Sequence, residues 1–253
     1  MDLPYEILVK ILSYLPNCDI LRRVAGVSRN LYQISQDQHL LRRIEFEFKD
    51  EMISVAPNWS EDRKEKYRND FLEVVKKSRN LKCLSVKMKS DGYDWLDKEL
   101  FPILRQMFDD LSSIENQCLE EFCLAPKSFT WINHFIENVF GYLDKCPKLK
   151  IIKLDKIKLY ERLITGNKCR ILKELKKSKL KTLEEFHLTV SGTLEIGSLK
   201  ALLEIISEKP NVKRIFLTLG YLKLKTEVSQ VCQEFGLKKK VKIRVMYPGG
   251  DSV

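Results

Sequence analysis

A six-residue pattern with large apolar residues at its first, fourth and sixth positions recurs along the chain, and it restricts the fold more than any other feature of the sequence. Its copies occupy residues 41–46, 81–86, 119–124, 149–154, 183–188, 212–217 and 238–245, the last of them degenerate. Leu81-x-x-Leu84-x-Val86 is a clear example. The alternation of apolar and other residues at the end of each copy indicates a short strand. The sequence therefore predicts seven strands, whose starts are 26 to 40 residues apart.

Segments with a helical spacing of apolar residues separate these strands. They span residues 61–78, 100–110, 129–146, 161–177, 198–208 and 227–235. Three of the helical segments lead into the next strand through a similar five-residue phrase, which begins at Lys77, Lys145 and Glu208. A similar phrase at the same place before each strand indicates a structural repeat of one strand and one helix.

A unit of one strand and one helix cannot bury its own apolar face, so such units stack on one another. Stacking predicts an α/β fold in which a parallel sheet is backed by helices. The arrangement resembles a leucine-rich-repeat array of the irregular, helix-backed kind. The alternative is a non-repeating α/β domain whose parallel strands share the pattern, because leucine-rich sequences produce it easily and its spacing is uneven.

The first 48 residues carry a different pattern. Large apolar residues recur at helical spacing from Leu3 to Leu15, and they are Leu3, Ile7, Leu8, Ile11, Leu12 and Leu15. Pro4 suits a first helical turn and Pro16 ends the segment. Asp19 can cap a second helix, and a third helix is expected over residues 30–38. The first helix is apolar on more than one face, so we expect a partner surface to cover what three small helices cannot bury.

The order and spacing of these residues resemble an F-box. The resemblance covers Leu3-Pro4, Glu6-Ile7-Leu8, Leu15-Pro16, Val27-Ser28-Arg29 and residues 40–44. Leu31 and Leu41 stand where the family usually has tryptophan, a replacement that keeps these positions apolar but reduces their contact area. The resemblance implies a small three-helix F-box over residues 1–44, followed by the repeat array over residues 45–253.

Ten apolar residues are candidates, by their position in the family motif, for docking on a Skp-family adaptor and for the small core beneath that interface. They are Leu3, Pro4, Ile7, Leu8, Ile11, Leu15, Leu21, Val27, Leu31 and Leu41. The sequence does not divide them into core and interface. Leu41 also begins the first strand pattern, so we expect the F-box to join the array without a flexible linker.

The composition excludes several classes of protein and site. No run approaches the ~20 apolar residues of a membrane helix, and we expect no signal peptide before the first motif. The seven cysteines include no Cys-x-x-Cys pair, which predicts reduced thiols, a cytoplasmic or nuclear location and no zinc site. Phosphate-binding, nucleophile-elbow and zinc-protease motifs are absent from the sequence. We expect no enzyme activity, no cofactor and no metal.

The positive charge of the chain is concentrated in its second half. The net charge is +10 overall, and residues 145–253 carry 25 basic and 11 acidic residues, a net charge of +14. In each predicted strand the residues between the apolar positions face away from the core. The last two strands place a basic group with one aromatic residue on that face. We therefore predict a substrate-binding surface formed by Arg214, Phe216, Lys240, Lys242 and Arg244.

The F-box resemblance implies a substrate adaptor of a ubiquitin ligase. The F-box would dock on a Skp-family adaptor, which connects to a cullin and a RING-type ligase, while the array holds an unknown target protein. One alternative is a basic repeat protein that binds nucleic acid, because its charge attracts phosphates, although no aromatic stacking motif accompanies the lysines. Another is an F-box scaffold that works outside a ligase.

Overall fold

A single parallel sheet organises the molecule. The computed structural model describes residues 3–15, 24, 26–35, 37–49, 61–78, 80–89, 97–114, 118–125, 132–157, 170–190, 196–219, 223–234 and 240–245. The strands are β1 (Arg43–Lys49), β2 (Cys83–Lys89), β3 (Glu121–Ala125), β4 (Ile151–Ile157), β5 (Glu185–Val190), β6 (Arg214–Leu219) and β7 (Val241–Val245). They pair in parallel, and their order in the sheet is their order in the chain.

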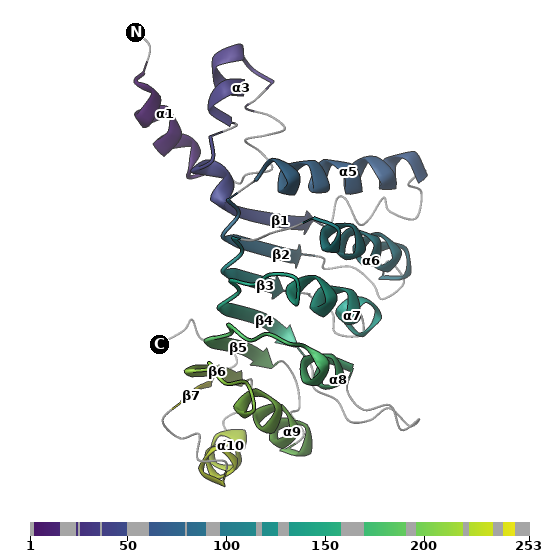
Figure 1. Ribbon diagram of the computed structural model, residues 1–253, viewed down its shortest axis with the longest axis vertical. Coiled ribbons are helices and arrows are strands. Elements are labelled where there is room, and N and C mark those ends of the chain that lie inside the picture. Colours follow the sequence, from purple (N-terminus) through teal and green to yellow (C-terminus); the bar gives the residue numbers. More distant parts are fainter. Residues whose placement is uncertain are drawn as a thin grey trace.

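Helices fill the connections between the strands. The described residues contain the α-helices α1 (Tyr5–Leu12), α3 (Arg29–Ser35), α5 (Glu61–Lys77), α6 (Asp97–Ser112), α7 (Ile132–Leu143), α8 (Arg170–Lys177), α9 (Ile196–Ser207) and α10 (Lys223–Glu234), and the 3-10 helix η2 (Leu40–Arg42). Figure 1 shows α5 to α10 in a row along one side of the sheet, with α1 and α3 projecting beyond β1. The predicted α/β fold with a parallel sheet backed by helices is confirmed. Among the described helices, none is long and apolar enough to cross a membrane.

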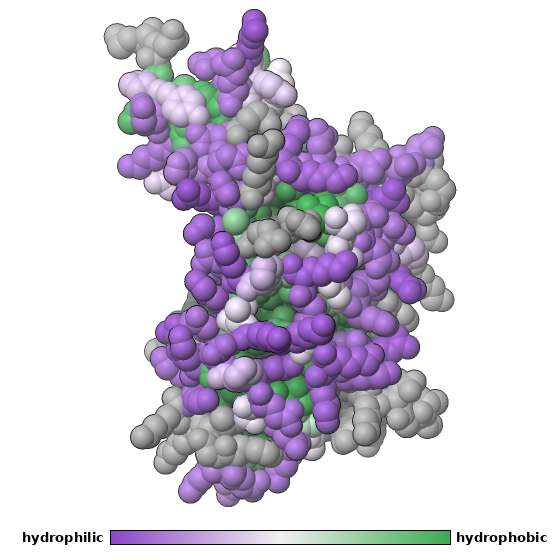
Figure 2. Space-filling view, viewed as in Figure 1, coloured by the Kyte–Doolittle hydropathy of each residue, from purple (hydrophilic) through white to green (hydrophobic). Residues whose placement is uncertain are grey.

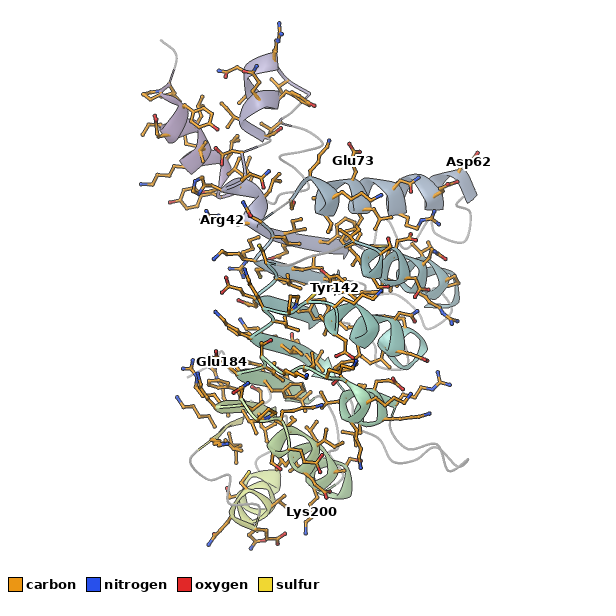
Figure 3. The ribbon with its side chains drawn as sticks, viewed as in Figure 1. Arg42, Asp62, Glu73, Tyr142, Glu184 and Lys200 are labelled. Carbon is orange, nitrogen blue, oxygen red and sulfur yellow. The ribbon has the colours of Figure 1, made fainter. Side chains whose placement is uncertain are left out.

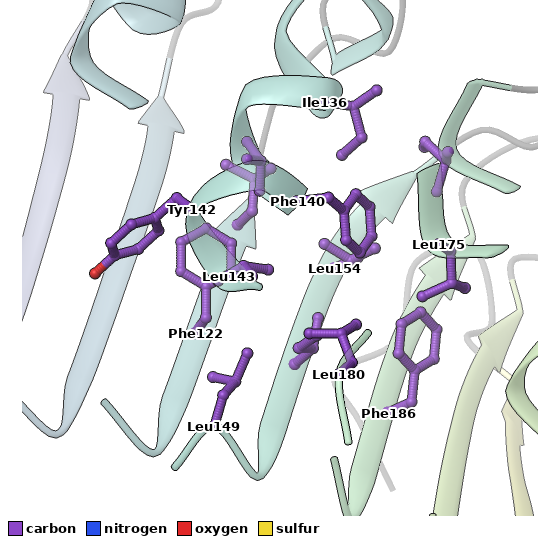
Figure 4. Packing of buried hydrophobic residues seen from close by; sticks show 14 of the residues in the cluster. Phe122, Ile136, Phe140, Tyr142, Leu143, Leu149, Leu154, Leu175, Leu180 and Phe186 are labelled. Carbon is purple, nitrogen blue, oxygen red and sulfur yellow. The ribbon is translucent and has the colours of Figure 1, made fainter. Parts of the chain in front are cut away.

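The alternation within each strand pattern builds the main core. The fourth position of the pattern lies in register from strand to strand and is at most 1% exposed in the first six, as Ile44, Leu84, Phe122, Ile152, Phe186 and Ile215. Helical residues pack on this layer. In Figure 4, Phe122 of β3 lies next to Tyr142 and Leu143 of α7. Burial of this many large apolar residues is the principal force that holds the strands and helices together.

Successive strand–helix units stack through the same backbone contact. The carbonyl oxygen of Lys82 accepts hydrogen bonds from the amides of Glu120 and Glu121, both at 2.9 Å. Glu120, Lys150 and Glu184 repeat this double contact with the unit that follows each of them. These residues lie where the strands begin, at the edge marked by Arg42 and Glu184 in Figure 3. The recurrence shows that the units stack with nearly equal geometry despite their unequal lengths.

Charged side chains reinforce this edge. The Glu120 carboxylate lies 2.9 Å from Lys82 Nζ and 3.3 Å from Lys150 Nζ, so it connects three consecutive units. The hydrogen bond from Lys82, followed by that from Lys150, lowers the pKa of Glu120 despite partial desolvation. Glu184 forms the equivalent pair with Lys213 at 2.8 Å. Such exposed pairs contribute about 0–1 kcal/mol each, and they mainly favour the correct register between units.

The N-terminal residues form a separate small core. Leu12, Ile34 and Leu40 are its buried centre, and Leu8 and Leu31 pack against them half-buried. Helix α3 ends at Ser35, earlier than the predicted residue 38. Asp37 accepts a hydrogen bond from the His39 amide, and this local turn replaces further helix. The second predicted helix and residues 161–169 of the fourth predicted connecting helix lie mostly or wholly outside the described residues.

The N-terminal unit joins the sheet without an intervening linker. Helix η2 ends at Arg42 and β1 starts at Arg43. The carbonyl oxygen of Arg42 accepts a hydrogen bond from the amide of Lys82, which leads into β2. Gln38 adds a second connection, because its Nε2 donates to the carbonyl oxygen of Lys77 at the end of α5. The joint is therefore fixed to the first two strands and to α5.

Candidate functional site

Exposed apolar side chains concentrate in the N-terminal unit. Within the described residues, the large hydrophobic side chains with high exposure are Leu3, Tyr5, Ile7, Ile11, Tyr14, Leu15, Val27 and Tyr32, with exposed fractions of 42–80%. All of them lie in the first 32 residues, on α1, on α3 or next to these helices. We call these eight residues the N-terminal apolar surface. Figure 2 shows green apolar side chains in the lobe at the upper left, which α1 and α3 form.

The structure separates the candidate docking residues into exposed and internal ones. Leu3, Pro4, Ile7, Ile11, Leu15 and Val27 are exposed, whereas Leu8 and Leu31 are half-buried against the small core. Leu21 lies outside the described residues.

One candidate does not fit an interface. Leu41 is 1% exposed, because η2 turns its side chain inward at the junction with β1. It has no surface to offer a partner in this structure, so its position in the motif is structural.

Three tyrosines of the N-terminal apolar surface were not among the candidate residues. Tyr5, Tyr14 and Tyr32 are 48%, 80% and 51% exposed. Tyr5 and Tyr32 lie on α1 and α3 between the apolar positions of the inner stripe, and Tyr14 lies in the turn that follows α1. Tyr5 also has a structural contact, since its hydroxyl donates a hydrogen bond to the carboxylate of Asp37.

A second surface is the face of the sheet opposite the helices, which we call the open face. Its residues occupy alternate positions in each strand, as in Glu121-x-Cys123 and Glu185-x-His187-x-Thr189, and most of them are half-buried or exposed. Three carboxylates on this face pair with a basic residue on the following strand. Lys87 Nζ lies 2.6 Å from Glu45, Lys153 Nζ lies 2.6 Å from Glu121, and Arg214 pairs with Glu185.

Two residues expected on the open face are buried instead. Cys83 and Ser85 have exposed fractions of 7% and 2%. Their strand β2 lies between β1 and β3, and the register places their small side chains among the longer ones of Arg43, Glu45 and Glu121. Burial raises the pKa of Cys83 to about 11, so its thiol stays protonated and unreactive at neutral pH.

The far end of the open face, over β5 to β7, contains the predicted substrate-binding residues. Phe216 stacks on His187 with ring centres 4.2 Å apart, and Lys242 Nζ lies 5.6 Å from the centre of the Phe216 ring. Burial lowers the pKa of His187 against the opposing effect of its hydrogen bond to Glu185, so the imidazole is neutral at pH 7.

The basic residues of this region differ in their pairing. Arg214 is neutralised by Glu185, whereas Lys240, Lys242 and Arg244 are exposed and have no carboxylate partner among the described residues. The structure therefore brings all five predicted substrate-binding residues onto one surface, and three of them carry uncompensated charge.

No group of three or more His, Cys, Asp or Glu side chains in the described part of the chain is arranged to hold a metal ion. Burial raises the pKa of Cys146 to about 12 and also raises that of Cys123. The N-terminal apolar surface and the open face present apolar and charged side chains that suit binding to another molecule.

Comparison with known families identifies the N-terminal unit. Residues 1–47 match the F-box-like family. The match includes every residue of the N-terminal apolar surface and ends within β1. Strands β2 to β7 lie outside it. No curated protein sequence matches the chain.

Proposed function

We propose that the chain is a substrate-recognition adaptor of a Skp–cullin–F-box ubiquitin ligase. The observation that carries this proposal is the coincidence of the F-box-like match with the N-terminal apolar surface. Burying a large apolar side chain contributes about 1.5–3 kcal/mol, so exposed residues such as Ile7 and Ile11 favour a protein partner. In F-box proteins that partner is a Skp-family adaptor, which connects to a cullin–RING ligase.

The array of strands and helices is proposed to hold the target protein. We assign it to the leucine-rich-repeat type, supported by the in-register apolar positions and by the recurring double contact of Lys82, Glu120, Lys150 and Glu184. The chain itself makes and breaks no bonds. It raises the effective concentration of substrate lysines near the ubiquitin-charged conjugating enzyme. Its free thiols are consistent with work in the cytoplasm or nucleus.

Adaptor docking is tested by reversing the character of the exposed face of α1. The variant Ile7→Glu with Ile11→Glu places two charges in the interface while leaving the buried Leu12 intact. We expect binding to a purified Skp-family adaptor to weaken by roughly 100-fold or more, measured by titration calorimetry, because apolar anchors dominate such interfaces.

A matched variant separates this effect from damage to the helix. Lys10→Ala changes an exposed residue of the same helix and should bind the adaptor like the wild type. The variant Leu3→Ala with Pro4→Ala gives an independent reduction of the same surface. Adaptor binding by the Ile7/Ile11 variant at wild-type affinity would refute the proposal.

Co-purification distinguishes a ligase subunit from an F-box scaffold. A ligase subunit brings the cullin and the RING protein with the Skp-family adaptor, whereas a scaffold brings the adaptor alone. Recovery of the adaptor without cullin from cells would favour the scaffold.

A further inference from the structure

Three ion pairs of alternating sign join neighbouring strands of the open face. An acidic residue on β1, β3 and β5 faces a basic residue on β2, β4 and β6, in the pairs Glu45–Lys87, Glu121–Lys153 and Glu185–Arg214. Strand β7 interrupts this alternation, since its open-face residues Lys242 and Arg244 are basic and Lys240 directly precedes it. Asp155 on β4 is an open-face carboxylate with no cationic partner among the described side chains. At a strand spacing of about 4.8 Å it is three strands, or about 14 Å, from β7.

Strand β7 is also the edge of the sheet. It pairs with β6 on one side, and no described strand pairs with its other side. An edge strand presents backbone amides and carbonyls that another strand can pair with. Lysines on an edge strand discourage pairing with identical chains, but they favour pairing with a segment of opposite charge.

The core-facing residues of β7 are incompletely covered. Val241 and Ile243 are in register with Ile215 and Leu217 of β6. The two β6 residues are fully buried and their counterparts on the preceding strands are at most 4% exposed, whereas Val241 and Ile243 are only half-buried. The edge therefore has cations without a carboxylate partner among the described residues on one face, and half-buried β-branched residues on the other.

We infer that β7 accepts an eighth strand from a partner protein, in the form of an extended segment whose acidic residues alternate with apolar ones. This inference rests on the proposed function, because the segment would belong to the substrate that the array holds. Side chains on one face of a strand recur about every 6.6–6.8 Å, and Lys242 and Arg244 are two residues apart on one face of β7. Acidic residues on the added strand would then lie directly opposite these cations, and its apolar residues would cover Val241 and Ile243.

The two-faced character of the edge favours polypeptide over nucleic acid. A nucleic acid could pair its phosphates with Lys242 and Arg244, but it would leave Val241 and Ile243 half-exposed and the outer edge of the β7 backbone unpaired. Phe216, the aromatic residue of this region, is already stacked on His187 and approached by Lys242. Residues 246–253 of the chain itself contain a single acidic residue, Asp251, so they do not supply the alternating charge.

The inference is tested with synthetic peptides and the full chain. The probe is a fluorescently labelled peptide of alternating aspartate and valine, long enough for a strand of about six residues. Its control has the same composition with the aspartates and valines in separate blocks. We expect the alternating peptide to bind roughly tenfold more tightly than the block peptide by fluorescence anisotropy, and to slow hydrogen exchange of the amides of residues 241–245.

A double substitution in β7 and a double substitution in α8 with the same charge change locate the site. Lys242→Glu with Arg244→Glu should weaken binding of the alternating peptide by roughly tenfold or more, and the milder Lys242→Gln with Arg244→Gln should weaken it less. Lys173→Glu with Lys176→Glu makes the same charge change on exposed residues of α8 and should leave binding nearly unchanged.

Several outcomes would overturn the inference. The first is equal binding of the alternating and block peptides, the second is equal weakening by the β7 and α8 variants, and the third is unchanged amide exchange in β7. Each would show that binding depends on net charge alone and not on strand addition. Tighter binding of random single-stranded DNA than of the alternating peptide would assign the edge to nucleic acid. The Ile7→Glu/Ile11→Glu variant should still bind the peptide, so a failure of adaptor docking can be distinguished from a failure of strand addition.

Discussion

Tyr5 shows how a single residue can serve both the interface and the stability of the N-terminal unit. Its ring belongs to the N-terminal apolar surface, while its hydroxyl donates to the carboxylate of Asp37. Partial desolvation alone would raise the pKa of Asp37. The hydrogen bonds from the Tyr5 hydroxyl and the His39 amide outweigh it, so the pKa of Asp37 is lowered. The same hydrogen bond is the largest of the effects that raise the pKa of Tyr5.

We predict that Tyr5→Phe loosens α1 at neutral pH and has little effect in acid. A hydrogen bond to a partly exposed carboxylate contributes roughly 1 kcal/mol after solvent screening. Because the pKa of Asp37 is lower in the folded chain than its unfolded value of about 3.9, this contribution is present above that value and is lost as the pH falls through the folded pKa.

Hydrogen exchange of the α1 amides, measured from pH 7 downward, tests this pH dependence. Asp37→Asn should reproduce the Tyr5→Phe loosening at neutral pH. If the difference in α1 amide exchange between wild type and Tyr5→Phe stays constant below the pKa of Asp37, the assigned contact is contradicted.

At the scale of elements, Phe108 of α6 connects two strand–helix units. Its ring lies edge-to-face with Phe122 of β3 at 6.1 Å and stacks with Phe135 of α7 at 5.9 Å, and Tyr142 is 6.4 Å away. All four side chains are at most 1% exposed. Removing this ring would leave a cavity shared by α6, β3 and α7, which cannot close without moving a whole helix.

Phe108→Ala is therefore expected to lower the free energy of unfolding by about 3–5 kcal/mol in urea denaturation. The control is Phe216→Ala, which removes a half-buried ring from the open face and should cost clearly less. Because stacked units contact mainly their neighbours, hydrogen exchange should rise most in β3, α6 and α7. Equal destabilisation by the two variants would show that Phe108 is not central to the packing.

The positions of the strands could be predicted from the sequence, whereas the burial of certain side chains could not. The strands were predictable because each pattern places two apolar residues on one face, and Ile152 and Leu154 pack as that alternation requires. The burial of Ser85 was not predictable, because it depends on the side chains of both neighbouring strands. The burial of Leu41 could not be predicted from the sequence for a related reason. Its motif position is apolar in either role, and only the geometry of η2 decides between core and surface.

The binding surfaces show the same division. The basic character of Lys242 and Arg244 is visible in the sequence. That neither has a carboxylate partner among the described residues becomes visible only when the strand order pairs Arg214 with Glu185 and leaves β7 at the edge. Likewise, the helical spacing of α1 indicates an excess of apolar residues, while the packing of Leu12 and Ile34 determines that Ile7 and Ile11 remain outside.

At the scale of the whole molecule, the joint between η2 and β1 determines where the array lies relative to the N-terminal unit. No residue separates the two elements, and the Arg42 carbonyl and Gln38 side chain bind the joint to β2 and α5. If the N-terminal unit docks on a ligase and the array holds a substrate, this joint sets the distance between substrate lysines and the conjugating enzyme. A stiff joint confines that distance to a narrow range, which keeps the effective concentration high.

We predict that an eight-residue Gly-Ser insertion between Arg42 and Arg43 uncouples the two parts without impairing either binding surface. A flexible linker of this length has an end-to-end distance of about 16 Å. The distribution of distances between fluorophores on Lys10 of α1 and Glu204 of α9 should therefore become wider by an amount comparable to this linker length. The same insertion in the connection between β4 and α8 should leave the distribution narrow.

In a reconstituted ligase the joint insertion should slow ubiquitin transfer to a bound substrate while adaptor affinity stays unchanged, because docking is intact and only positioning is lost. Unchanged transfer with a broadened distribution would show that the fixed joint is a feature of folding alone.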